Sequence, residues 1–363
     1  MTVKVRSFAK INLGLRIGAP RGDGFHDLHT VYQTIALHDV IRIRVKRGSG
    51  IEIRCADPRV PRDEANTCYR IVERCMAALQ AKGHVVVEID KRLPVQGGLG
   101  GASANAVATL LGLQRALKKT LPGEEKLRIA AEVGSDLPLF LVGGAVLGIG
   151  RGEQVYPLPD LPAMPCVVVI PEVGVSTPKA FAEWDRLCGA GTPARQAALA
   201  QSKVEDFQRQ NSAALRPAGQ PGAAVPTGAG SKLTVSNPSD RMIELGRGLS
   251  AWLSELHSGA PSGSGGGGRA GNPLLRLVRA GIENDFEQVV FPEYPELREG
   301  KSALLRAGAK YASLSGSGST LYGLFASKAA AASAVNRLRK QGWTALATST
   351  LPRRAYWRRV FAG

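Results

Sequence analysis

A glycine-rich segment with the order Leu93-Pro-Val-Gln-Gly-Gly-Leu-Gly-Gly-Ala-Ser-Ala-Asn105 is the strongest sign of chemistry in this sequence. Glycines let the backbone approach a ligand closely, and successive N–H groups at a helix start bind phosphate oxygens. An amphipathic stretch follows directly, so we predict an anion-binding loop at a helix N-terminus. No Gly-Lys-Ser/Thr closes the segment, which excludes a Walker A loop. The alternative is a glycine turn without a ligand.

Three other positions gain meaning only beside that loop. A second glycine loop, Ser313 to Thr320, lies between two predicted strands and could close over the same ligand, or it could be a plain hairpin turn. Asp136 precedes Leu-Pro, where an aspartate is usually a turn or cap residue. Lys10 falls on a predicted strand, where a lysine is usually a solvated charge. Each signal is ambiguous alone, and their order along the chain carries the information.

The periodicity of apolar residues predicts the elements that hold these positions. Odd-numbered apolar residues from Val3 to Ile17 indicate a half-buried strand with Lys10 and Asn12 on its other face. A helix is expected from about Ser103 to Lys119, directly after the first glycine loop. The other expected elements are a helix at 66–81, strands at 41–45, 51–55, 85–89, 146–149 and 166–170, a strand, loop and strand at 311–325, a helix at 328–341 and a strand at 344–351. This alternation predicts the α+β class.

The composition is that of a globular protein. With 363 residues, 44% of them hydrophobic and 21% charged, the chain can form two domains of ordinary size. No apolar run approaches the roughly 20 residues of a membrane helix, and the first residues lack the pattern of a secretory signal. We therefore expect a cytoplasmic protein without a membrane partner. The net charge of +17 is scattered and lacks interleaved aromatic residues, so we expect an anionic small-molecule substrate and no dedicated nucleic-acid binding. The oligomeric state is not predicted.

One long segment has a different composition. Between Gly189 and Asn272 the chain is rich in Gly, Ala, Pro and Ser, which bury too little apolar surface to order a backbone. We expect a flexible insertion at about 190–270. Inside it, one apolar stripe at helical spacing predicts a short helix that docks on the body. The stripe consists of Met242, Leu245, Leu249, Trp252, Leu253 and Leu256.

The order of the chemical segments resembles the GHMP kinase superfamily. It runs from an early lysine on a strand through a Pro-x-x-x-Gly-Leu-Gly-x-x-Ser loop and a Gly-x-Asp to a late Gly-x-Gly. Within the superfamily the chain is most similar to the diphosphocytidyl-methylerythritol kinase family, over nearly everything except about residues 190–270. The segments that carry this similarity are Ala9–Leu13, Asp23–His26, Leu28–Thr30, Gly97–Gly101 with Asn105, Gly134–Pro138, Gly150–Glu153, Thr177–Phe181, Asn284–Glu287 and the late Ser-Gly-Ser-Gly.

The resemblance implies a two-domain GHMP kinase fold. Residues 1–160 would form an N-terminal domain of the ribosomal protein S5 domain 2-like type that contains the phosphate loop. Residues 161–363 would form a ferredoxin-like C-terminal domain, interrupted by the insertion. ATP and the substrate would meet in the cleft between them.

The resemblance also implies the site residues. Lys10 and Asp136 would be the catalytic pair. The implied ATP-binding residues are Asn66, Pro94, Val95, Gln96, Gly97, Gly98, Leu99, Gly100, Gly101, Ala102, Ser103 and Ala104. The implied substrate-binding residues are Asn12, Phe25, His26, Thr177, Phe181, Gly316 and Gly318. Two aromatic rings would sandwich the cytosine, and His26 would hydrogen-bond its edge. Gln96, Ala102 and Ala104 depart from the family pattern, which leaves Ser103 as the hydroxyl available to magnesium.

The implied reaction is a phosphoryl transfer from ATP with Mg²⁺. Asp136 would take the proton from the 2-hydroxyl of the methylerythritol, and Lys10 would keep Asp136 ionised and offset the developing charge. One alternative is another GHMP kinase acting on homoserine or mevalonate, which would leave Phe25, His26 and Phe181 without a base to stack on. The other is a non-catalytic basic protein that binds RNA in a salt-dependent manner and does not turn over ATP.

Overall fold

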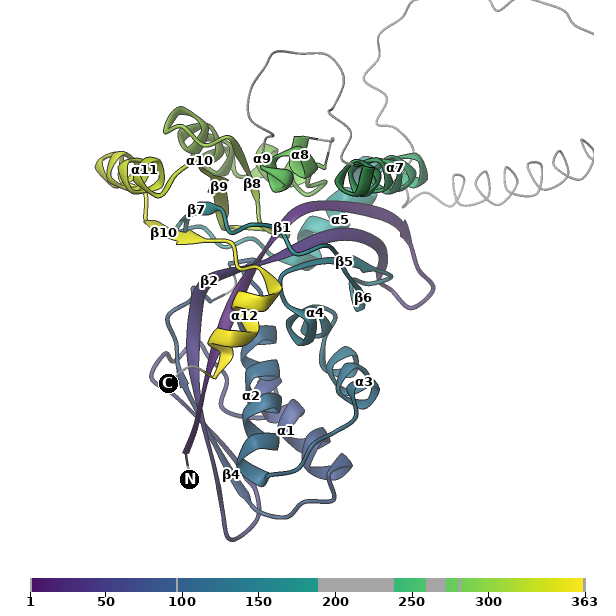
Figure 1. Cartoon of the computed structure of the whole chain (residues 1–363), viewed down its shortest axis with the longest axis vertical. Helices are drawn as coiled ribbons and strands as arrows, with labels where there is room; N and C mark the ends of the chain where they lie inside the picture. Colours follow the sequence, from purple (N-terminus) through teal and green to yellow (C-terminus); the bar gives the residue numbers. More distant parts are fainter. Residues whose placement is uncertain (1, 96, 189–237, 259–271, 280–281, 362–363) are drawn as a thin grey trace, which may run out of the picture.

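The computed structural model describes residues 2–95, 97–188, 238–258, 272–279 and 282–361, and it contains two β-sheets (Figure 1). A long antiparallel hairpin of β1 (Thr2–Pro20) and β2 (His26–Lys46) runs from the lower to the upper part of the molecule in this view. The register shifts between Phe8 and Lys10 and again between Asn12 and Gly14. Such bulges bend a strand and increase its twist, which lets β1 contact both halves of the protein.

The larger sheet has the strand order β3-β4-β2-β5-β6, with β1 paired to the other edge of β2. Four helices cover one face of it, and their apolar residues share a core with the inward-facing residues of the strands. The strands are β3 (Ile51–Cys55), β4 (His84–Asp90), β5 (Ala145–Ile149) and β6 (Gln154–Pro157). The helices are α1 (Thr67–Ala78), α2 (Gly101–Leu117), α3 (Gly123–Val133) and α4 (Leu137–Val142).

The smaller sheet is antiparallel with the order β10-β7-β9-β8. Its strands are β7 (Pro165–Val169), β8 (Tyr311–Leu314), β9 (Leu321–Leu324) and β10 (Ala345–Ser349). Helices connect β7 to β8 and β9 to β10, which is the βαββαβ pattern of ferredoxin-like folds. These helices are α5 (Thr177–Cys188), α7 (Pro238–Ser258), α8 (Pro273–Arg279), α9 (Glu287–Glu293), α10 (Pro295–Arg306) and α11 (Lys328–Lys340). The predicted α+β class with a ferredoxin-like C-terminal part is confirmed.

The strand β1 is buried on both faces from Ser7 to Gly18, so the expectation of a half-buried strand is wrong in this part. Ala9, Ile11 and Leu13 pack in a core that also contains residues of the smaller sheet and of α7. On the opposite face, Lys10 and Asn12 line a cavity. Period-two alternation alone would leave the face with Lys10 open, but the first glycine loop packs at Gly100 on the Lys10 side chain, and this lysine is 3% exposed.

The predicted helix inside the Gly/Ala/Pro/Ser-rich segment is confirmed as α7. Leu245, Leu249 and Trp252 are buried, and the Trp252 indole N–H donates to the carbonyl of Pro273 at 3.0 Å. The apolar stripe therefore docks on the body, as its spacing predicts. The expected flexible parts of the insertion, at 189–237 and 259–271, lie outside the described residues.

The last helix, α12 (Arg353–Val360), returns to the larger sheet. Tyr356 and Val360 are buried in the same core as Val3 and Val5. Ahead of the helix, the backbone N–H of Leu351 donates to the carbonyl of Thr34 at 2.8 Å. Residues 351–360 thus pack with the N-terminal half. The domain boundary near residue 160 stays a prediction.

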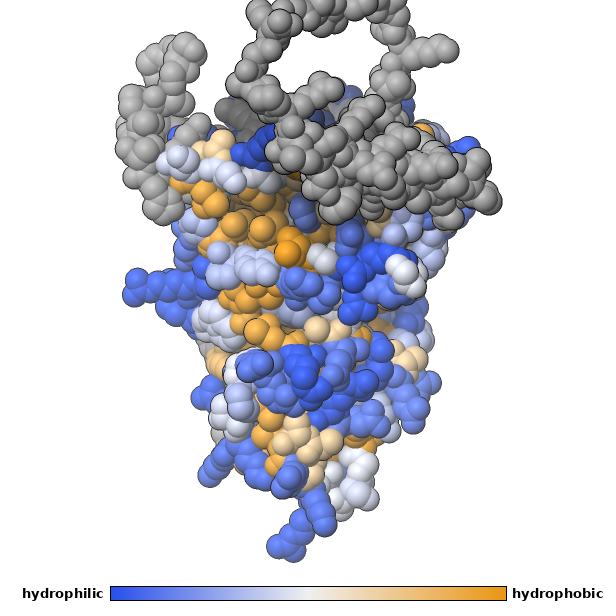
Figure 2. All heavy atoms as spheres, turned by 90° about the vertical axis from the view of Figure 1, so that its right-hand side faces the viewer, coloured by the Kyte–Doolittle hydropathy of each residue, from blue (hydrophilic) through white to orange (hydrophobic). Residues whose placement is uncertain are grey.

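The face that carries the tip of the β1–β2 hairpin shows hydrophobic patches that are broken up by hydrophilic residues (Figure 2). Phe25, in the turn of this hairpin, is 49% exposed. Among the helices that the structure describes, none combines the length and the apolar character of a membrane span.

Candidate active site

Lys10 on β1 and Asp136 just before α4 come together from distant parts of the sequence. The Lys10 Nζ lies 3.5 Å from the Asp136 Oδ2 and donates to the Asn12 Oδ1 at 2.6 Å. Asn12 in turn donates to the Thr30 hydroxyl at 2.8 Å. The Lys10 side chain is 4% exposed and the Asp136 side chain 33%. A fixed ammonium thus stands beside a carboxylate that a ligand can reach.

Tyr32 holds the same carboxylate from the other side. Its hydroxyl donates to the Asp136 Oδ1 at 3.0 Å, and the Lys10 Nζ lies 5.6 Å from the centre of its ring. Burial, followed by the nearby charge of Asp136, raises the pKa of Tyr32 well above its usual range. The phenol therefore stays protonated and orients the carboxylate.

The first glycine loop leads into α2 as the sequence predicts. Gly100 caps the helix in the left-handed conformation, and the Leu99 carbonyl accepts a hydrogen bond from the Lys10 backbone N–H at 3.0 Å. Because the first N–H groups of a helix have no partner within it, the start of α2 offers donors to an anion. The loop is thereby tied to β1, the strand that carries Lys10.

The entry to this loop is fixed by Asp39, which is fully buried. Its carboxylate accepts hydrogen bonds from the backbone N–H groups of Arg92 and Leu93 and from the Lys91 Nζ, each at 2.7 Å. The Asn105 Nδ2 on α2 donates to it at 3.0 Å. One carboxylate therefore holds both ends of the segment 91–105 in place.

The two glycine loops touch each other. Gly98 has φ +72°, and a Cβ added to it would lie 2.1 Å from the Ser315 carbonyl oxygen. The Ser315 hydroxyl donates back to the Gly98 carbonyl at 3.0 Å. Only a glycine permits this approach. The second loop also reaches Lys10, since a Cβ at Gly316 would lie 3.4 Å from the Lys10 Nζ.

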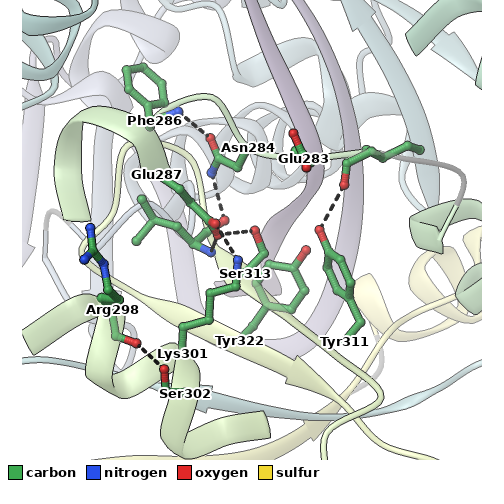
Figure 3. A network of polar contacts seen from close by, with 12 residues as sticks. Glu283, Asn284, Phe286, Glu287, Arg298, Lys301, Ser302, Tyr311, Ser313 and Tyr322 are labelled. Atoms are coloured by element: carbon green, nitrogen blue, oxygen red, sulfur yellow. Dashed lines mark hydrogen bonds and ion pairs between the residues drawn. The ribbon is translucent and has the colours of Figure 1, made fainter. Parts of the chain in front are cut away.

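A polar network beneath the second glycine loop holds its shape (Figure 3). The Asn284 side-chain amide donates to the carbonyls of Leu314 and Gly316 at 2.9 and 2.8 Å. The Glu287 Oε1 accepts from the Ser313 hydroxyl at 2.8 Å and from the Leu314 N–H at 2.9 Å. The segment Asn284–Glu287 thus holds residues 313–316, at the start of the loop, in place.

Aromatic residues gather elsewhere in the cavity that Lys10 and Asp136 line. The rings of His26 and Phe181 stack with centroids 4.7 Å apart and an interplanar angle of 14°, and Phe286 meets Phe181 edge-on. The His26 Nε2 lies 2.7 Å from an oxygen of Asp185. We define His26, Phe181 and Phe286 as the aromatic wall. Phe25 stands apart from it, with the Arg151 guanidinium 4.9 Å from its ring centre.

The sandwich of two rings that the sequence led us to expect is not preformed. His26 occupies one face of Phe181, so a base would have to stack where His26 now lies or on the exposed Phe25. The rings stack on each other because apolar faces exclude water even without a ligand. The use of these residues in binding stays a proposal.

One cavity of about 960 Å³ connects the two glycine loops, the pair of Lys10 and Asp136, and the aromatic wall. Most of the predicted site residues line it. Ala104 does not, because its side chain is buried in the core and its N–H donates to the Gly100 carbonyl. Gly318 lies behind the loop, against Leu314, and Gln96 lies outside the described residues. Asn66 lines the cavity, but its side chain caps α1 by accepting from the Cys68 N–H at 2.8 Å.

Comparisons with known proteins agree with this geometry. The GHMP kinases N-terminal domain matches residues 66–144, and the GHMP kinases C-terminal domain matches 271–342. The 4-diphosphocytidyl-2-C-methyl-D-erythritol kinase of Solibacter usitatus is 34% identical over 360 residues, which cover 99% of this chain and 92% of that one. The chain belongs to this kinase family.

Solved structures of other kinases are also similar to this chain in fold. The crystal structure of a 4-(cytidine 5'-diphospho)-2C-methyl-D-erythritol kinase is 26% identical with a TM-score of 0.63, and the match covers 96% of this chain and 98% of that one. Homoserine kinase from Cytophaga hutchinsonii has a TM-score of 0.62 at 18% identity over 97% of this chain and 95% of that one. At that identity it shows the shared GHMP kinase fold alone.

Sequence reasoning missed Tyr32, Asp39 and Asp185 in this GHMP kinase site. Tyr32 pairs with Asn12 in the hairpin register, so it shares a face with Lys10, but only the register reveals this. Asp185 follows Thr177 and Phe181 at intervals of four, and this helical spacing was a usable signal for a third residue facing the cavity. For Asp39 the sequence holds no local sign, because all its hydrogen-bond partners come from residues 91–93, after β4, and from α2.

Proposed function

We propose that this chain transfers the γ-phosphoryl group of ATP to the 2-hydroxyl of 4-diphosphocytidyl-2-C-methyl-D-erythritol. The products are ADP and the 2-phosphate, in the non-mevalonate route to isopentenyl diphosphate. The observation that carries the proposal is the single cavity in which Lys10 and Asp136 lie between a phosphate-binding loop and an aromatic wall. A kinase for a small alcohol without a base would not need that wall.

In this proposal the two ends of the cavity bind the two substrates. The start of α2 and the loop from Gly97 to Ser103 receive the ATP phosphates. Phe25, His26, Thr177 and Phe181 receive the cytidine end. The hydroxyl that accepts the phosphoryl group then lies at Asp136, between the two glycine loops.

The chemistry at Asp136 follows from its neighbours. The carboxylate is held by the Tyr32 hydroxyl and by the ammonium of Lys10. The carboxylate can accept the proton of the 2-hydroxyl. The same ammonium offsets negative charge that develops on the attacking oxygen and on the transferring group.

Magnesium would reach the site with ATP. Among the described residues there is no group of three or more His, Cys, Asp or Glu side chains that could hold a metal ion alone. This fits Mg²⁺, which is commonly bound by substrate phosphates, a few protein oxygens and water. Ser103 at the start of α2 and the carboxylate of Asp136 are among the side-chain oxygens that line the cavity. The bound ion would neutralise charge on the phosphates.

The decisive assay measures ADP release with the cytidine substrate, homoserine and mevalonate in parallel. We expect turnover with the cytidine substrate only. Turnover with homoserine or mevalonate alone would assign another GHMP kinase activity. Salt-dependent RNA binding without ATP turnover would favour a binding protein. The cytoplasmic location and the lack of a nucleic-acid partner stay predictions from the sequence.

Replacing Phe181 with alanine should weaken binding of the cytidine substrate. Stacking of a base on an aromatic ring contributes about 1–3 kcal/mol, so the KM for this substrate should rise roughly 10- to 100-fold. The KM for ATP should stay within a few-fold, because the ring lies at the other end of the cavity. Leu187→Ala is the matched control, since Leu187 is on the same helix and is 42% exposed. An equal rise in both KM values would refute the assignment of Phe181.

A further inference from the structure

The helix α7, which lies inside the Gly/Ala/Pro/Ser-rich segment, is tied to the body by buried charges. The Arg241 Nη2 lies 2.6 Å from the Asp285 Oδ1, and the two side chains are 7% and 0% exposed. The Arg16 Nη1 approaches the same oxygen at 2.9 Å, and the Ile17 N–H donates to the Asp285 Oδ2 at 3.0 Å. Glu283, which is mostly exposed, lies 3.7 Å from Arg241.

Arg241 also contacts α5, the helix that carries part of the aromatic wall. Its guanidinium lies 5.7 Å from the ring centre of Trp184, a side chain that is 1% exposed. With the Gln288 amide in the orientation that satisfies its hydrogen bonds, the Gln288 oxygen accepts from both terminal nitrogens of Arg241. One guanidinium therefore joins α7, α5 and the segment around Asp285.

Two of these partners, Trp184 and Asp285, are each adjacent to a residue that lines the cavity. Trp184 precedes Asp185, which holds the His26 ring, and Asp285 precedes Phe286, which packs on Phe181. Trp184 and Ala180 form the buried side of α5, whereas Thr177, Phe181 and Asp185 face the cavity. A shift of Trp184 or Asp285 would move the aromatic wall.

The polar contacts of Arg241 are more specific than the docking of α7 on the body requires. Leu245, Leu249 and Trp252 already bury the apolar stripe of α7. Burying an arginine and an aspartate costs desolvation energy that their attraction roughly offsets, so such pairs add little net stability, but their hydrogen bonds allow few geometries. Burial also raises the pKa of Asp285, and the two guanidiniums oppose this rise. The cluster is therefore better suited to setting a position than to adding stability.

We propose that Arg241 is a positioning residue for substrate binding: through Trp184 and Asp285 it fixes α5 and Phe286, and so the aromatic wall that receives the cytidine end. This inference rests on the proposed function. It assigns part of the inserted segment to the active site, although none of the α7 side chains that the structure describes lines the cavity.

The first test is the variant Arg241→Met, which keeps the aliphatic bulk and removes the guanidinium. The KM for the cytidine substrate should rise about tenfold, while kcat and the KM for ATP stay within about twofold. Arg241→Lys restores the charge beside Asp285 but not the planar contact with Trp184, so it should recover part of the loss. Arg247→Met on the exposed side of α7 is the matched control and should leave all three constants unchanged.

A second measurement does not depend on the identity of the substrate. Hydrogen exchange of the α5 amides should become faster in Arg241→Met and remain unchanged in Arg247→Met, with α2 as an internal reference. If Arg241→Met does not fold, the KM for the cytidine substrate and the α5 exchange of Arg241→Lys test the proposal instead. The proposal is overturned if folded variants show unchanged KM and α5 exchange, or if both KM values rise equally. If the wild-type chain does not use the cytidine substrate, the proposed function is refuted. The exchange data would still test whether Arg241 holds α5 in place.

Discussion

Asp136→Asn should lower turnover by about 10²–10⁴-fold, the usual contribution of a positioned general base. The amide keeps the size of the side chain, and its oxygen can still accept from the Tyr32 hydroxyl, so the surrounding structure should not change. Binding of both substrates should change little, because their proposed contacts come from the glycine loop and the aromatic wall. Single-turnover phosphorylation with both substrates saturating measures this effect. A rate within a few-fold of wild type would remove Asp136 from the catalytic role.

Two further variants sharpen this test. Lys10→Ala should also slow turnover, and because both residues serve one proton-transfer site, the double variant should lose less than the product of the two effects. Asp185→Asn is the contrasting control, since this carboxylate lines the same cavity but contacts His26. It should raise the KM for the cytidine substrate and leave kcat nearly unchanged.

The second large effect is expected for Gly98→Ala. The new Cβ would lie 2.1 Å from the Ser315 carbonyl oxygen, and the residue would keep a φ of +72° that side chains disfavour. The left-handed conformation costs about 1–2 kcal/mol and the overlap about 1–3 kcal/mol more, so kcat/KM for ATP should fall by roughly 10²-fold. The two glycine loops must separate to relieve the overlap.

Gly101→Ala is the matched control for this prediction. A Cβ at Gly101 would have its nearest contact at 3.4 Å, to the Lys91 Nζ, which is ordinary packing. Its position inside the first turn of α2 also favours alanine. Steady-state kinetics with ATP as the varied substrate compares the two. Equal activity of both variants would show that the contact between the loops is not needed.

Much of the fold could be predicted because its signals are local. The helix expected at 103–119 is found at Gly101–Leu117, and the one expected at 328–341 is found at Lys328–Lys340. Among the described helices, the unpredicted ones are α3, α4, α5, α8, α9, α10 and α12. Three of them, α5, α10 and α12, begin next to a proline, at Pro178, Pro295 or Pro352, and proline near a helix start was a usable signal.

The site residues could be predicted where they belong to short sequence motifs. The glycine loops and the order of Lys10 and Asp136 carried the resemblance that implied phosphoryl transfer, and the cavity brings these segments together. Tyr32 and Asp39 could not be predicted, because their partners are set by strand register and by long-range packing. The stacking of His26 on Phe181 was also beyond reach, since it depends on how two distant segments fill space without a ligand.

The position of α12 has a consequence for synthesis on the ribosome. Tyr356 and Val360 complete a core that begins with Val3 and Val5, so the N-terminal half cannot close this core until the last helix has left the exit tunnel. Contacts between the two ends of a long chain form late, and the unfinished half exposes apolar surface until they do. Nascent chains stalled before residue 351 should therefore be far more sensitive to protease across residues 2–46 than the released protein.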